Sequence, residues 1–161
     1  MTKIIVTILA FLLTFFPNSS FLLSNYQNFS FLGKDTINNI IVEAINNDDA
    51  DTIEGLLSQH TKENGENLNQ KIKELIAAID GDIVDYQEHG SGGGGEYSDS
   101  GVSVKDENWK IHIKTDTNKE YLVCVSWVIV NTNNSEKVGM KTLRLIDTDF
   151  NQIATIYTPT T

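Results

Sequence analysis

Hydrophobic positions along the chain follow two periods, and the change from one to the other predicts the architecture. From residue 34 to residue 79, apolar residues recur every three or four positions, as on one face of a helix. From Asp82 onward they alternate with polar residues or run in short blocks, which is typical of strands. Helices followed by strands favour an α+β fold, with three helices on one face of a curved antiparallel sheet of five to six strands.

The expected elements follow from this pattern and from the cap and turn residues between them. Helices are predicted at 34–46, at about 51–59 and at 67–79, with a polar loop at 61–66. Strands are predicted at 83–88, 97–105, 109–114, 121–130, 138–146 and 152–157. The stretch 121–130 is rich in β-branched and aromatic residues, so we expect it in the middle of the sheet.

A two-residue turn at Thr117-Asn118 would pair Asp116 with Lys119 and so set the register of the central hairpin. That register places one set of residues on the helix-covered side: Trp109, Ile111, Ile113, Leu122, Cys124, Val128 and Val130. The other side then combines Lys110, His112 and Lys114 with an apolar stripe, which predicts a partner face or a homodimer contact through the sheet. The predicted partner face consists of Tyr121, Val123, Val125, Trp127 and Ile129. A turn longer by one residue would reverse the two sides.

The first 24 residues have the pattern of a leader. Lys3 precedes the apolar run Ile4–Phe16, which as a helix spans roughly 20 Å and is shorter than the hydrocarbon core of a bilayer. We therefore expect residues 1–24 to be a signal peptide or an uncleaved membrane anchor, 25–33 a spacer, and 34–161 a single domain. The expected location is extracytoplasmic, either secreted or held at the outer face of the cell membrane by the leader.

Charge and cysteine content narrow the partners. The net charge of -10 would repel a phosphate backbone, which argues against nucleic-acid binding, and would also oppose adsorption to anionic lipid. Cys124 is the single cysteine, so neither an intramolecular disulfide nor a cysteine-based metal site can form, and its apolar surroundings indicate a small core residue.

The motifs that suggest chemistry are incomplete. The glycine run 90–95 lacks the Gly-Lys-Ser/Thr ending of a phosphate loop, and is expected to be a flexible connection. Asp147, Asp149 and Asn151 have the opening spacing of a calcium loop, but Gln152 replaces the required glycine, so a polar turn is expected. Histidines 60, 89 and 112 do not have metal-ligand spacing. The sequence therefore predicts neither catalytic residues nor a metal site nor a cofactor.

Helices followed by a curved sheet in a chain of this size resemble the nuclear-transport-factor-2-like or cystatin-like cone, as does the helix-break-helix stretch 48–57. Residues 35–158 are similar to a family of uncharacterised exported bacterial proteins, many of them lipoproteins. The stretches that carry this resemblance are 81–86, 121–130, 138–139 and 143–146. Asn25 stands where a lipobox would have its cysteine, which excludes lipid anchoring there. The resemblance implies a fold and an extracytoplasmic address, and it implies no reaction.

Three functions are consistent with these observations. The leading hypothesis is a non-catalytic exported binding domain for a protein or a small ligand. One alternative is a cone-fold enzyme with an acid–base pocket between helices and sheet, for which Tyr86 and Trp109 would line the pocket. The other is an immunity or inhibitor protein whose acidic surface masks a basic partner.

Overall fold

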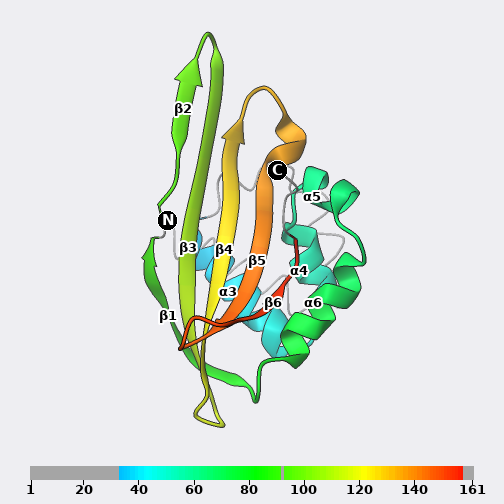
Figure 1. The fold of residues 1–161 in the computed structure, drawn as a ribbon, viewed down its shortest axis with the longest axis vertical. Coiled ribbons are helices and arrows are strands. Elements are labelled where there is room, and N and C mark those ends of the chain that lie inside the picture. Colours follow the sequence, from blue (N-terminus) through cyan, green and yellow to red (C-terminus); the bar gives the residue numbers. More distant parts are fainter. Residues whose placement is uncertain (1–32, 92, 158–161) are drawn as a thin grey trace, which may run out of the picture.

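The computed structural model describes residues 33–91 and 93–157 and confirms the α+β class (Figure 1). Its helices are α3 (Lys34–Asn46), α4 (Ala50–Leu56), α5 (Gln59–Asn64) and α6 (Leu68–Ala77), and a 3-10 helix, η2, covers Ser135–Lys137. Its strands are β1 (Ile83–Ser91), β2 (Glu96–Asp99), β3 (Val102–Thr115), β4 (Glu120–Asn131), β5 (Gly139–Asp147) and β6 (Gln152–Thr155).

The helical half differs from expectation between α4 and α6. The predicted helix 51–59 ends at Leu56, and α5 forms in the segment expected to be a polar loop. Ser58 explains the difference, because its side-chain oxygen accepts a hydrogen bond from the backbone N–H of Thr61 at 3.1 Å and caps α5. The N–H of Ser58 also donates to the carbonyl of Met140 at 3.0 Å, so the α4–α5 link covers part of the edge of β5.

The sheet has the order β1-β3-β4-β5-β6, and β2 pairs with the N-terminal part of β3. All paired strands are antiparallel. The segment expected as one strand at 97–105 is a hairpin. Ser100 and Gly101 have φ of 51° and 85°, and this turn separates β2 from β3. β3 then continues without a break through the predicted strand 109–114.

The predicted register of the central hairpin was wrong by one residue. The N–H of Thr115 donates to the carbonyl of Lys119 at 2.9 Å, which leaves a three-residue loop in which Asn118 has φ of 61°. Asparagine tolerates this left-handed conformation, so the longer loop forms at little cost. Ile113 consequently faces Tyr121, and the two sides of β4 exchange places.

The reversal moves the predicted partner face into the interior. Its first four residues are buried, with Val123 fully enclosed and Trp127 only 2% exposed, and Ile129 packs at the edge of the core. The prediction that these five residues form an exposed surface was therefore wrong. The placement of Trp109, Ile111 and Ile113 on the helix-covered side was correct, because all three belong to the same core cluster.

Helix α3 lies behind the sheet in Figure 1 and is held there by polar contacts. The indole Nε1 of Trp109 donates to Asn38 Oδ1 at 2.7 Å in the buried interior. Asn46 makes two bonds to the backbone of Ile83, at 2.8 and 2.9 Å. Lys34 lies 3.0 Å from a carboxylate oxygen of Glu107 on β3. These contacts fix both ends of α3 against the sheet.

The predicted leader at 1–24 and nearly all of the spacer lie outside the described residues. Within the described ranges, none of the helices combines the length and the apolar character that a membrane crossing needs.

Candidate functional site

Helices cover one side of the sheet, and the side that faces the viewer in Figure 1 carries none. We call this side the outer face. Since side chains alternate along a strand, the register assigns its central part from β3, β4 and β5. The outer face consists of Lys110, His112, Lys114, Leu122, Cys124, Ser126, Thr142, Arg144 and Ile146.

Two cations flank the single cysteine at the centre of the outer face. Lys110 on β3 and Arg144 on β5 are both cross-strand partners of Cys124 on β4. Among the residues that the structure describes, neither cation takes part in an ion pair. Cys124 is only 7% exposed although no helix covers it, as expected when the long stems of neighbouring cations lie over a small side chain.

The two cations and burial act on the cysteine thiol in opposite directions. Burial raises the pKa of Cys124, whereas the positive charges of Arg144 and Lys110 lower it, and burial has the larger effect. The thiol is therefore protonated near neutral pH and is a poor nucleophile. Cys124 was predicted to be a small core residue on the helix-covered side. It is buried, but the predicted side was wrong, because it lies on the outer face and outside the main core cluster.

Acidic side chains gather at one end of the outer face. Lys114 lies in register between Asp85 on β1 and Glu120 on β4. His112 Nε2 lies 3.2 Å from a carboxylate oxygen of Glu120, and the ring of His89 is 6.0 Å from that of His112. The carboxylates offset the charge of Lys114, so the excess positive charge is at Lys110 and Arg144.

The turn between β5 and β6 brings an aromatic ring beside Lys110. Asp147 accepts hydrogen bonds from the N–H groups of Asp149 and Asn151 at 2.9 and 2.8 Å, and from the Asn151 amide at 3.0 Å. These bonds, above all those from Asn151, hold the pKa of Asp147 below its usual range. The calcium-like motif is thus a polar turn, as predicted. The turn places the exposed ring of Phe150 5.5 Å from Lys110 Nζ.

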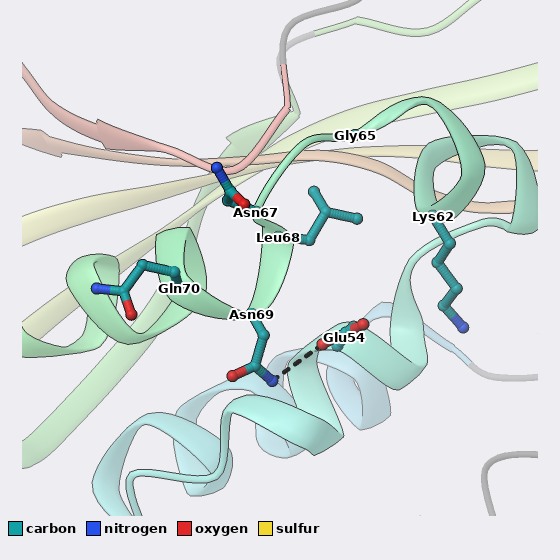
Figure 2. Close-up of a pocket in the computed structure, with 7 residues that line it drawn as sticks. All are labelled: Glu54, Lys62, Gly65, Asn67, Leu68, Asn69 and Gln70. Carbon is teal, nitrogen blue, oxygen red and sulfur yellow. Dashed lines mark hydrogen bonds between the residues drawn. The ribbon is translucent and has the colours of Figure 1, made fainter.

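A separate polar groove of about 460 Å³ lies beside α4 and α6 on the helical side (Figure 2). Its lining residues are Glu54, Lys62, Gly65, Asn67, Leu68, Asn69 and Gln70. Asn69 on α6 donates a hydrogen bond of 3.0 Å to Glu54 on α4, which joins the two helices. This bond is the dashed line in Figure 2.

The charged groups of this groove already have partners. Lys62 donates to the carbonyl of Gly55 at 3.3 Å, and partial burial lowers the pKa of Lys62 while Glu54 opposes that shift. Asn69 also bonds to Asp51, at 3.1 Å. Because these polar groups bind one another, the groove connects helices and offers a ligand fewer unpaired groups than the outer face does.

The predicted pocket-lining residues lie on the helix-covered side and are used in packing. Trp109 is 2% exposed, and its ring centroid is 6.3 Å from that of Trp127. Tyr86 donates its hydroxyl proton to Asn39 of α3. Burial, with the charges of Asp35 and Glu43, raises the pKa of Tyr86. Both residues therefore connect α3 to the sheet.

Titratable groups are scarce in the interior. The buried polar residues of the described ranges are Asn38, Ser58, Thr61 and Thr115. In the same ranges, His, Cys, Asp and Glu side chains do not form a group of three or more that could hold a metal ion. The candidate site is therefore the outer face, where Lys110 and Arg144 lie on either side of Cys124 without an ion pair among the described residues.

The sequence placed Lys110 and His112 together on one side of β3, but it missed their neighbours. The wrong register set Val123 beside them in place of Cys124, and Arg144 entered the site only through the pairing of β4 with β5. The alternation of Lys110, His112 and Lys114 was the one signal of this site in the sequence.

Comparison with protein families matches the chain to a family model. The model described as Domain of unknown function (DUF5104) matches residues 40–148, which is more than half of the 161 residues. The matched range runs from α3 to the end of β5 and includes the outer-face residues. A search of the curated proteins finds no match to the chain.

Proposed function

The chain belongs to the DUF5104 family, and we propose that its domain is a non-catalytic binding module that acts outside the cell and holds a protein partner on the outer face of its sheet. The observation that carries this proposal is the pair Lys110 and Arg144. Both cations lie on the helix-free side of the central strands and, in the described part of the chain, are without an ion pair. Unpaired charge on a broad sheet suits a macromolecular surface better than a small enclosed ligand.

Export is the second part of the proposal and rests on the leader pattern of residues 1–24. The finer fold assignment, a nuclear-transport-factor-2-like or cystatin-like cone, is also proposed, on the support of helices packed against one face of an antiparallel sheet. In cones of this kind the space between helices and sheet holds any pocket. Here Trp109 and Trp127 fill part of that space, which favours binding outside it.

The binding surface can be tested with a photo-crosslinking amino acid placed at Thr142 on the outer face, in full-length protein expressed in its own cells. Lys73, exposed on α6 of the helical side, is the matched control position. We expect a discrete crosslinked protein from position 142 and none from position 73. Crosslinks of equal yield from both positions, or from position 73 alone, would contradict the proposal.

Export is tested separately by determining the N-terminus and location of the protein. The expected result is protein outside the cytoplasm, with an N-terminus after residue 20 if the leader is cleaved. Intact protein confined to the soluble cytoplasm would contradict export and leave the crosslinking result to be judged by itself.

A further inference from the structure

We propose that the segment bound on the outer face is an acidic, amphipathic stretch of a protein chain, held by Lys110 and Arg144. This inference rests on the proposed binding function and specifies its partner. It starts from how the positive charges of this domain are distributed.

Positive charge is scarce in this chain, with 12 Lys and Arg residues against 22 Asp and Glu. Two of the described lysines form ion pairs with acids. Lys34 contacts Glu88 and Glu107, and Lys105 also contacts Glu107. What distinguishes Lys110 and Arg144 from the other basic residues is their position: they flank Cys124 on one face of the sheet, without an ion pair among the described residues. An acidic partner would complement these two charges, while the acidic remainder of the surface would repel it elsewhere.

The spacing of the two cations suits an extended peptide. Strands in a sheet are about 4.8 Å apart, so residues on β3 and β5 that flank β4 are roughly 10 Å apart at their backbones. Carboxylates two positions apart on an extended segment lie on the same side of it, about 7 Å from each other. The flexible stems of Lys110 and Arg144 can close that difference, and a guanidinium binds a carboxylate through two parallel hydrogen bonds.

Apolar groups beside the cations favour a peptide over a phosphate polymer or a lipid headgroup. Phe150 is 68% exposed next to Lys110. On β6, Ile153 is 42% exposed and lies two positions before Thr155, the cross-strand partner of Arg144. A segment that alternates acidic and apolar side chains would place carboxylates on the cations and its apolar side chains against Phe150 and Ile153.

A hydroxyl beside Arg144 is also unused. The side-chain oxygen of Thr155 is buried and has no hydrogen-bond partner in the described part of the chain. Buried polar groups usually have one, so this hydroxyl is a donor that a carboxylate held by Arg144 could satisfy.

Fluorescence anisotropy with a labelled synthetic decapeptide of alternating Glu and Leu tests the inference on the exported form of the protein. A decapeptide of alternating Lys and Leu and inorganic polyphosphate serve as competitors. We expect saturable binding that weakens with added salt. In the double variant Lys110→Glu/Arg144→Glu, affinity should fall at least about tenfold, because each reversal replaces an attraction by a repulsion.

Two further variants keep the result interpretable. Lys73→Glu makes the same charge change on the helical side and should leave the affinity within about twofold of wild type, because exposed charges beyond a Debye length are screened. The neutral variant Lys110→Gln/Arg144→Gln should weaken binding by a smaller factor than the charge reversal. Circular dichroism checks that each variant is folded.

Three outcomes would overturn the inference. The first is a loss of affinity in Lys73→Glu as large as in the double variant, and the second is tighter binding of the Lys-Leu peptide than of the Glu-Leu peptide. The third is displacement of the labelled peptide by polyphosphate at a lower concentration of negative charges than the unlabelled Glu-Leu peptide requires. If any of them occurs while the crosslink from position 142 persists, the binding module stands and its partner has a different chemistry. If the crosslink is also absent, the proposed function itself fails.

Discussion

The two sides of strand β4 obtain their burial in different ways. Val123 and Trp127 lie under the helices and belong to a core that includes residues from α3, α4 and α6. Cys124, between them in sequence, is almost as well covered although it faces away from the helices. On the helix-covered side the burial comes from helices packed against the sheet, whereas on the outer face Cys124 has the cations Lys110 and Arg144 as its cross-strand neighbours. Substitutions on the first side should therefore affect stability, and substitutions on the second should affect binding.

The largest expected effect comes from the centre of the helix-covered side. Trp127→Ala should lower the free energy of unfolding by about 3–5 kcal/mol, because it leaves a cavity that the surrounding core cannot refill. Urea denaturation followed by circular dichroism measures the change. Ser126→Ala, the adjacent position on the outer face, is the matched control and should stay within about 0.5 kcal/mol of wild type. A comparable loss in both variants would contradict the assignment of the two sides.

A second substitution probes the polar contact between α3 and the sheet. Asn38→Ala removes the acceptor for the buried indole N–H of Trp109, and an unsatisfied buried donor costs about 1–3 kcal/mol. Asn39→Ala, at the next and exposed position, removes only an exposed bond to Tyr86 and should cost less than about 1 kcal/mol. Urea denaturation of both variants, monitored by tryptophan fluorescence, makes the comparison. Equal losses of unfolding free energy would show that the buried hydrogen bond between Trp109 and Asn38 stabilises the fold no more than the exposed one between Tyr86 and Asn39.

A third prediction concerns the β3–β4 loop, whose length determines which side chains of β4 face the helices. Asn118→Ile should destabilise the domain by about 1–2 kcal/mol, because a β-branched residue resists the left-handed conformation at this position. Asn118→Gly should change the stability by less than about 0.5 kcal/mol, since glycine adopts that conformation freely. Thermal unfolding of the two variants tests the three-residue loop. If the isoleucine variant is as stable as the glycine variant, the loop does not require φ > 0 at residue 118.

The smallest expected effect is pH-dependent and involves the ion pair that holds α3. The hydrogen bond from Lys34 holds the pKa of Glu107 below its usual range. A carboxylate with a lowered pKa stabilises the fold above its unfolded pKa, and this contribution is lost as the pH falls through the folded pKa. Wild type should therefore exceed Glu107→Gln by about 0.2–1 kcal/mol at pH 7, and the gap should close between about pH 5 and pH 3.

Denaturant titrations at a series of pH values measure this gap. Glu136→Gln, which replaces an acid outside the ion pairs of the described residues, is the control and should change the free energy of unfolding at pH 7 by less than Glu107→Gln does. A pH-independent gap for Glu107→Gln would exclude the ion pair as its cause.

The sequence predicted the class of the fold because its periodicity records burial directly. The helices near 34–46 and 67–79 and the strands around 109–114 and 121–130 each carry a repeated apolar pattern. It did not predict α5, whose polar sequence has no such pattern and which depends on the cap at Ser58 and on the edge of β5. The turn at Ser100-Gly101 that separates β2 from β3 was missed, although the apolar positions change phase there, from Tyr97 to Val102 and Val104.

The register of the central hairpin was harder to predict for a physical reason. Both sides of the segment 121–130 carry apolar residues, so the hydrophobic pattern does not distinguish them, and the loop length alone decides. The sequence favoured a two-residue turn, and the structure has a loop of three. The candidate site depends on that register together with the pairing of β4 with the next strand, β5, which brings Arg144 beside Cys124. The connection between these strands is longer than a tight turn and β4 has a bulge at Ser126/Trp127, so the sequence did not give the register of this second pairing.

The position of Cys124 between Lys110 and Arg144 has a practical consequence. Because Cys124 is the only thiol in the chain, the rate at which a reagent alkylates the protein reports on this one position. Because only 7% of Cys124 is exposed, alkylation requires neighbouring side chains to move, and the rate measures how often they do so. A partner bound to Lys110 and Arg144 would lower the alkylation rate of Cys124, whereas a molecule bound on the helical side would leave that rate unchanged. The domain thus contains its own occupancy reporter, readable by mass spectrometry without any engineered label.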